Sequence, residues 1–190
     1  MKEYTIPGGK ANLYGLLGIL PVAFLYCLVF TLIWRIPGTG LWTGWISVIA
    51  LNKPLLLKTI DAGWLVLVVI LAGIMAHELI HAVFMASFSE KGFRSVSFGF
   101  NLKAVAPYTH CKEKLSPLAY RVSLMMPAIL LGDLPALAGL ITGNILFLFF
   151  GIIFTWAATG DFIVLWLGRH LSNGSFQDHP EKIGFIHIEE

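Results

Sequence analysis

The sequence predicts an all-α membrane protein of about four transmembrane helices, with a short β-hairpin-like segment after the second helix. Two properties of the 190-residue chain favour this fold class: 57% of its residues are hydrophobic and only 13% are charged. An average soluble domain carries about 25% charged residues, so this chain has about half the usual solubilising charge. The formal net charge of +2 and the lack of a basic run exclude a typical nucleic-acid-binding protein.

Four segments are long and apolar enough to cross a bilayer, which takes about 20 mostly apolar residues. They are residues 14–34, 62–88, 119–141 and 145–168. The first of them continues to its end without a small-residue cleavage pattern, so we interpret it as a span and not as a signal peptide. Residues 1–168 are therefore predicted to form one polytopic membrane domain. Residues 169–190 are predicted to form a short cytoplasmic tail, in which His187 is solvated.

Two connections between the predicted spans have distinct compositions. Residues 35–61 hold two tryptophans and two lysines, which suits an interfacial or re-entrant segment with aromatic anchors. In the connection after the second span, residues 94–104 have a different pattern. Apolar residues there alternate with polar or small ones, at Val96, Phe98, Phe100, Leu102 and Ala104. A period of two predicts a strand or hairpin with one apolar face.

The positively charged side chains are divided unequally between the two sides of a four-span arrangement. Only Arg35, Lys53 and Lys58 of the thirteen lysines and arginines fall on the side opposite the termini. Since lysine and arginine favour the cytoplasmic side of a membrane, both termini are predicted to be cytoplasmic.

The second predicted span contains the sequence HELIH, an H-E-x-x-H pattern formed by His77, Glu78 and His81. On a helix, residues four apart project from one face, so the two imidazoles can hold one zinc ion. A zinc ion makes a water more acidic, and Glu78 can accept its proton as that water attacks a carbonyl carbon. Ionisable residues inside a span are rare and usually functional, which favours a zinc-hydrolase site over a chance match.

Other interpretations of this motif stay open. Histidines four apart on a span can also ligate haem or hydrogen-bond neighbouring helices, with Glu78 as a counter-charge. The corresponding functions are a non-catalytic membrane protein that binds metal or haem, and a scaffold derived from a protease. Catalysis is favoured because Glu78 is of no use to a simple metal carrier.

A catalytic zinc takes three protein ligands and keeps an open fourth position. The carboxylates within the later predicted spans belong to Asp133 and Asp161. His81 and Asp161 each lie about seven residues, or ~10 Å, from the cytoplasmic ends of spans that run in the same direction. Asp133 lies about fourteen residues, or ~21 Å, from that face. Depth therefore favours Asp161 as the third ligand, with Asp133 as the alternative.

Two family resemblances rest on these motifs. HELIH in one span and TGD in a later one resemble the site-2 protease class of intramembrane zinc metalloproteases. The pattern HELIHAVF, FGF, PYTHCKEKLSP, TGD and DHPEKIGF more closely resembles the putative zincin peptidase family of small prokaryotic membrane proteins, from about residue 70 onward. This resemblance implies a metalloprotease of the prokaryotic cytoplasmic membrane, in which His77, His81 and Asp161 bind one zinc ion and Glu78 is the catalytic base.

The resemblance also implies how a substrate is bound. Segment 94–104 resembles the membrane-adjacent strands that hold an extended substrate in site-2 proteases, which implies substrate contacts at Phe98 and Phe100; a plain cytoplasmic hairpin is the alternative. Asn144 is a further candidate for substrate binding. Site-2 proteases usually have an asparagine and a proline upstream of their aspartate, but no proline lies between Asn144 and Asp161 here. The implied partners are the lipid bilayer and a membrane protein or membrane-associated peptide as substrate.

Overall fold

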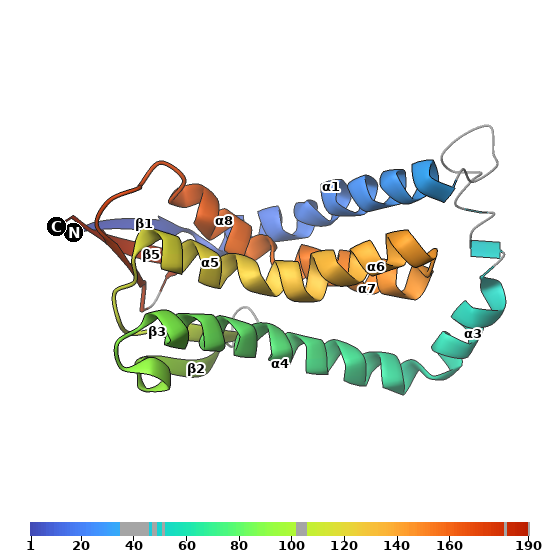
Figure 1. Cartoon of the computed structure of the whole chain (residues 1–190), viewed down its shortest axis with the longest axis horizontal. Coiled ribbons are helices and arrows are strands. Elements are labelled where there is room, and N and C mark those ends of the chain that lie inside the picture. The colour runs from blue at the N-terminus through green and yellow to red at the C-terminus, as the bar shows by residue number, and fades with distance from the viewer. Residues whose placement is uncertain (35–45, 47–48, 51, 102–105, 181, 190) are drawn as a thin grey trace.

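The computed structural model describes residues 1–34, 46, 49–50, 52–101, 106–180 and 182–189. Its elements are, in order, β1 (Lys2–Ile6), α1 (Gly8–Trp34), α3 (Lys53–Asp61), α4 (Gly63–Phe88), the 3₁₀ helix η1 (Gly92–Ser95), β2 (Val96–Asn101), β3 (Ala106–Cys111), α5 (Pro117–Pro127), the π-helix η2 (Ala128–Asp133), α6 (Leu134–Thr142), α7 (Ile145–Ala157), α8 (Thr159–Leu167), β4 (Ser175–Asp178) and β5 (Ile183–Ile188). The described chain is thus mostly helical, with small sheets gathered at one end (Figure 1).

Three helical segments among the described residues are long and apolar enough to cross a membrane: Gly8–Trp34, Gly63–Phe88 and Pro117–Thr142. The segment predicted as a fourth span, residues 145–168, consists of two helices. Helices α7 and α8 meet at an angle of 41°, and they add a fourth span if the bent pair is counted as one. The break has a local cause, because the Thr159 hydroxyl donates to the Trp156 carbonyl and competes with the helical hydrogen bonds there.

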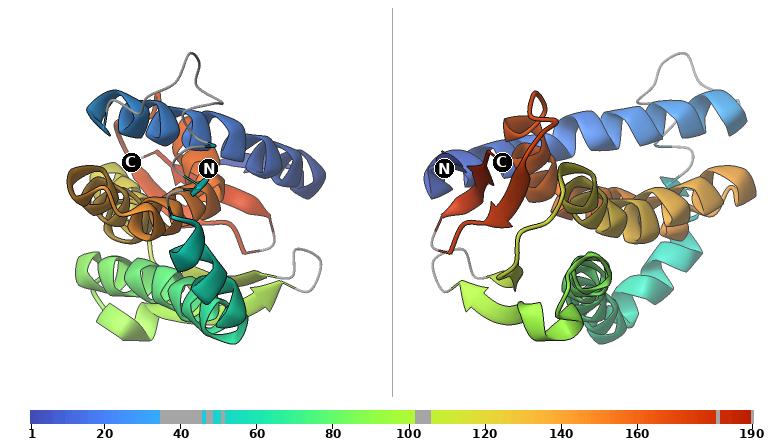
Figure 2. Two further views of the ribbon diagram at one scale, coloured as in Figure 1. Left: turned by 90° about the vertical axis from the view of Figure 1, so that its right-hand side faces the viewer. Right: turned by 60° about the vertical axis from the view of Figure 1, so that its left-hand side comes forward.

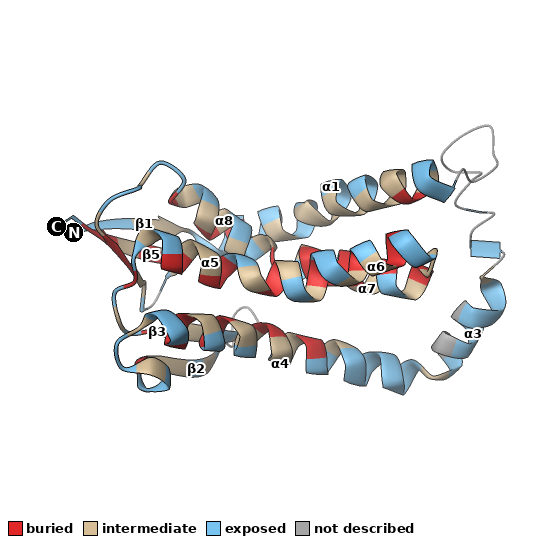
Figure 3. Ribbon diagram, viewed as in Figure 1, coloured by how far each residue is buried: buried red, intermediate tan, exposed pale blue. Residues whose placement is uncertain are grey.

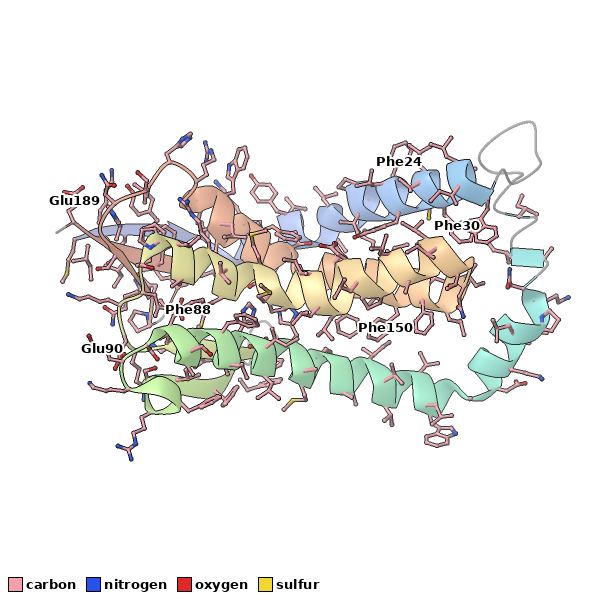
Figure 4. The ribbon with its side chains drawn as sticks, viewed as in Figure 1. Phe24, Phe30, Phe88, Glu90, Phe150 and Glu189 are labelled. Atoms are coloured by element: carbon pink, nitrogen blue, oxygen red, sulfur yellow. The ribbon has the colours of Figure 1, made fainter. Side chains whose placement is uncertain are left out.

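The helices form three layers, with α1 on one side, α5 to α8 in the middle and α4 on the other side (Figures 1 and 2). Helices α6 and α7 are joined by a tight turn, in which Gly143 takes the left-handed conformation with φ of 71°. Phe30 of α1 is directed toward this pair (Figure 4). The core between them consists of Phe30, Leu140, Ile145, Leu148 and Ile152.

The N-terminal and C-terminal segments pair in one antiparallel sheet of strand order β1–β5–β4. Both termini therefore lie at the same end of the molecule (Figure 1). Phe176 and Phe185 of this sheet are buried against α5, in a cluster that also holds Tyr120. The tail is thus a folded part of the protein. The prediction that His187 is solvated is wrong, since its Nε2 bonds the Asn173 carbonyl at 2.8 Å and its ring is buried.

The second sheet consists of β2 and β3, which pair antiparallel directly after η1. Strand β2 falls within the predicted segment 94–104, of which residues 102–105 lie outside the described part. Strand β3 lies beyond the predicted segment. Of the predicted interfacial segment 35–61, residues 35–45, which include both tryptophans, also lie outside the described part, and Lys53–Asp61 forms α3.

Burial is uneven along α4 (Figure 3). Every residue of its first two turns, 63–69, is exposed, as expected for a helix surrounded by lipid on all sides. Burial begins at Gly73 and follows one face to Ala86. The second half of α4 is therefore the part that packs against the rest of the protein.

Candidate metal centre

The two histidines of the HELIH motif lie on the buried face of α4. Buried positions on this helix recur every four residues at Gly73, His77, His81 and Met85, which places them along one stripe. Gly73 allows a close approach to α7, since a Cβ there would lie 2.1 Å from the Phe154 ring. The stripe thus brings both imidazoles toward the middle layer of helices.

Asp161 reaches the same place from α8. It lies in the first turn of that helix, directly after the 41° bend between α7 and α8. His77 Nε2 is 3.2 Å from Asp161 Oδ2, and His81 Nε2 is 3.3 Å from Asp161 Oδ1. The Nε2 atoms of the two histidines are 3.2 Å apart. The structure therefore brings together the three residues that the sequence predicted as ligands.

These distances fit a zinc ion. Zinc bonds to imidazole nitrogen and carboxylate oxygen are about 2.0–2.1 Å long, so the ligand atoms of a tetrahedral site lie about 3.3–3.4 Å apart. The two imidazole nitrogens lie 3.2 Å apart, which is close to this tetrahedral edge, and each nitrogen lies 3.2–3.3 Å from a different oxygen of the Asp161 carboxylate. His77, His81 and Asp161 are also the group of the described residues that can hold a metal ion.

A main-chain contact orients one of the imidazoles. His81 Nδ1 lies 2.8 Å from the carbonyl oxygen of Ser123, which is fully buried on α5. When Nδ1 donates its proton to this carbonyl, the Nε2 lone pair is left free and points toward Asp161 and His77. His77 Nδ1 is buried and has no hydrogen-bond partner among the described residues. The polar contacts of the His77 ring are therefore made through Nε2, with Asp161 and His81.

Glu78 lies beside this group and is half-buried. It adjoins His77 in the chain and lies three residues before His81 on α4. The Thr109 hydroxyl of β3 donates to the main-chain carbonyl of Glu78 at 2.9 Å. The hairpin is thus attached to α4 at the motif itself.

The alternative third ligand, Asp133, is not brought to the histidines. It ends the π-helix η2, where its Oδ1 accepts a hydrogen bond from the Tyr26 hydroxyl of α1. Thr155 Oγ1 lies 3.5 Å from the same oxygen. Asp133 therefore joins three helices through polar contacts away from the metal centre.

The predicted substrate-binding residues lie in two places. Asn144 caps the N-terminus of α7, where its side chain accepts hydrogen bonds from the main-chain N–H groups of Leu146 and Phe147. It lies thirteen residues before the end of this helix. The structure thus does not bring it to the metal centre. Phe98 and Phe100 lie on β2 and are 60% and 55% exposed.

Sequence reasoning missed the contacts that surround the motif. Ser123 contributes a main-chain carbonyl, and any residue type provides one, so no sequence signal could have found it. Thr109 lies in the segment PYTHC, whose proline weakens the strand pattern.

Of three comparisons with known proteins, one found a match. The model of the family described as "Putative zincin peptidase" matches residues 70–176, which is more than half of the chain and includes the motif and Asp161. No curated protein and no solved structure matches the chain. The description of the family suggests zinc and peptide hydrolysis. On this match, the chain belongs to the family described as "Putative zincin peptidase".

Proposed function

We propose that this protein is a zinc metalloprotease that hydrolyses peptide bonds within or beside a membrane. His77, His81 and Asp161 are the zinc ligands, and Glu78 is the general base. One observation carries the proposal: the Nε2 atoms of His77 and His81 lie 3.2 Å apart, and each lies 3.2–3.3 Å from an oxygen of the Asp161 carboxylate. This group lies beside a glutamate on a helix apolar enough to cross a membrane.

The chemistry follows from the roles of these residues. A zinc ion, when bound, supplies Lewis acidity that polarises the scissile carbonyl and makes a water a stronger acid. Glu78 takes a proton from the attacking water and later delivers it to the leaving amine, so the glutamate ends the cycle as it began. The Ser123 carbonyl keeps His81 in the tautomer that a ligand needs.

The placement in the membrane follows the distribution of charge. His81 lies seven residues before the end of α4, which is ~10 Å at a rise of about 1.5 Å per residue. Both sheets and both termini gather at this end (Figure 1). We propose that this end is cytoplasmic, because the lysines and arginines concentrate there, and that the substrate is cut near the cytoplasmic face.

Metal removal tests this function. Treatment with a zinc chelator is expected to abolish cleavage of a membrane-embedded reporter, and added zinc is expected to restore it, because a zinc ion held by His77, His81 and Asp161 would supply the Lewis acidity. The measurement is the initial rate of cleavage together with the zinc content of the purified protein. Cleavage that persists in metal-free protein would contradict the proposal, and a visible haem band would favour a carrier instead.

Strand β2 provides a site for the substrate. A helical peptide bond is shielded by its own hydrogen bonds and must be extended before hydrolysis. Strand β2 pairs with β3 along one edge, and no other described strand pairs with it. Phe98 pairs with Thr109, whose hydroxyl donates a hydrogen bond to the main-chain carbonyl of Glu78. These contacts fix the position of β2 relative to the motif. An extended substrate segment can add to the free edge of β2 by strand pairing.

Replacing Phe98 with aspartate is expected to lower the rate of cleavage by about tenfold or more. The reason is that an apolar substrate segment on this strand would bury the aspartate charge, which costs desolvation free energy. The zinc content should stay unchanged, since Phe98 lies outside the ligand group. Phe93→Asp is the matched control, because Phe93 is also exposed but lies in η1 and not in the strand. Equal rates for the two variants would remove β2 from substrate binding.

A further inference from the structure

Asp178 is a buried carboxylate that the proposed chemistry does not use. It is the last residue of β4, and its side chain is 13% exposed. One oxygen, Oδ2, accepts a hydrogen bond from the main-chain N–H of Cys111 at 2.8 Å. The other, Oδ1, accepts from the Tyr120 hydroxyl at 2.7 Å. Both oxygens are therefore occupied by donors from two different elements.

Each of these two elements contacts the HELIH motif. Cys111 lies on β3, two residues after Thr109, whose hydroxyl bonds the Glu78 carbonyl. Tyr120 lies on α5, three residues before Ser123, whose carbonyl orients His81. These separations correspond to about 7 Å along a strand and about 4.5 Å along a helix. Each oxygen of Asp178 thus bonds a residue that lies two or three positions from a residue in contact with the motif.

The surroundings make this connection stiff. Tyr120 and Cys111 are buried, and the Tyr120 ring packs edge-on against Phe176 with centroids 5.6 Å apart. Burial raises the pKa of the Asp178 carboxyl, and the hydrogen bonds from Cys111 and Tyr120 act in the opposite direction. A buried carboxylate is costly to fold compared with an apolar side chain, and its hydrogen bonds fix the geometry of the groups that donate to it.

We propose that Asp178 is a positioning residue that holds β3 and α5 in a fixed arrangement against α4, and thereby sets the orientation of Glu78 and of the His81 imidazole. In this proposal, the segment after α8 supports the metal centre through the hydrogen bonds of Asp178 to Cys111 and Tyr120. The catalytic consequence rests on the proposed function, whereas the effect on His81 and on metal binding does not.

Three substitutions separate the contributions of the two hydrogen bonds. Tyr120→Phe removes the bond to α5 and keeps the ring. Asp178→Leu removes both bonds. Asp178→Asn retains both, because its amide oxygen can accept from Cys111 and its amide nitrogen can donate to the Tyr120 hydroxyl. Lys182→Gln is the control in the same C-terminal segment, since the Lys182 side chain forms an exposed ion pair with Glu3.

The main readout is cobalt(II), which replaces zinc and whose visible absorption depends on the ligand geometry. Tyr120→Phe is expected to weaken metal binding by about tenfold and to shift the cobalt spectrum, as for the loss of an outer-shell partner. Asp178→Leu should show at least the same effect. Asp178→Asn should restore both properties, and Lys182→Gln should match the wild type. Thermal unfolding and kcat for cleavage are measured on the same samples.

The outcomes distinguish the possible errors. If Tyr120→Phe lowers the melting temperature but leaves the cobalt spectrum and affinity unchanged, Asp178 is only structural and the proposal is overturned. If Asp178→Asn perturbs the spectrum as much as Asp178→Leu, hydrogen-bond geometry is not what Asp178 provides, which also overturns it. If the spectra change as expected but the wild type cleaves no peptide, the proposed function fails while the positioning role stands. Should Asp178→Leu not fold, the other two variants decide.

Discussion

Replacing Glu78 with glutamine is expected to abolish cleavage while leaving the zinc content of the protein unchanged. Glutamine has nearly the same shape as glutamate, but its amide cannot accept a proton from the attacking water. General-base catalysis contributes roughly 10²–10⁴-fold to a rate, so kcat should fall by that factor. The histidines and Asp161 keep their contacts, because none of their hydrogen bonds or ion pairs involves Glu78. The measurements are kcat on a membrane-embedded reporter and zinc per protein.

Glu90→Gln is the matched control for this substitution. Glu90 is exposed and lies just beyond the end of α4 (Figure 4). Its replacement by glutamine makes the same chemical change away from the metal centre. Its kcat should equal that of the wild type. A Glu78→Gln protein that cleaves normally would exclude Glu78 as the base. A protein that acts as a scaffold would tolerate Glu78→Gln in cells, where membrane-protein fragments would be the same with and without the substitution.

Replacing Asp161 with asparagine is expected to weaken zinc binding by more than about a hundredfold. Loss of an outer-shell partner already costs roughly 10- to 100-fold in metal affinity, and Asp161 contributes a charged ligand directly. Two imidazoles alone leave the metal with two protein ligands where a catalytic site needs three. Cleavage should fall with zinc occupancy. The measurement is the zinc dissociation constant, obtained by competition with a chelating dye.

The same substitution at Asp133 is the discriminating comparison. Asp133 bonds Tyr26 and has no contact with the histidines, so Asp133→Asn should bind zinc like the wild type. Its effect should appear as lower stability, since the carboxylate that accepts the Tyr26 hydrogen bond is lost. Zinc retained in Asp161→Asn but lost in Asp133→Asn would reverse the assignment of the third ligand.

Three of the four predicted spans correspond to helices long and apolar enough to cross a membrane, and such helices depend on local physics. A bilayer selects for length and hydrophobicity, and both can be read from a continuous segment such as 62–88. The spacing of His77 and His81 on one face follows from the helical period alone. The rise per residue of a helix is constant, so the depths of His81 and Asp161 could be compared from the sequence. That comparison predicted Asp161 as the partner of the histidines.

The sequence alone therefore determined that the chain has long apolar helices, an H-E-x-x-H motif on one of them, and a carboxylate at matching depth. Only the tertiary structure decided that the termini pair in one sheet, that the chain bends between α7 and α8 just before Asp161, that Ser123 and Thr109 contact the motif, and that Asp178 bonds Cys111 and Tyr120. The reason is physical: helices and depth arise from interactions between near neighbours in the chain. Strand β1 meets β5, and Asp178 meets Cys111 and Tyr120, through contacts between distant segments, partly through main-chain groups that every residue carries.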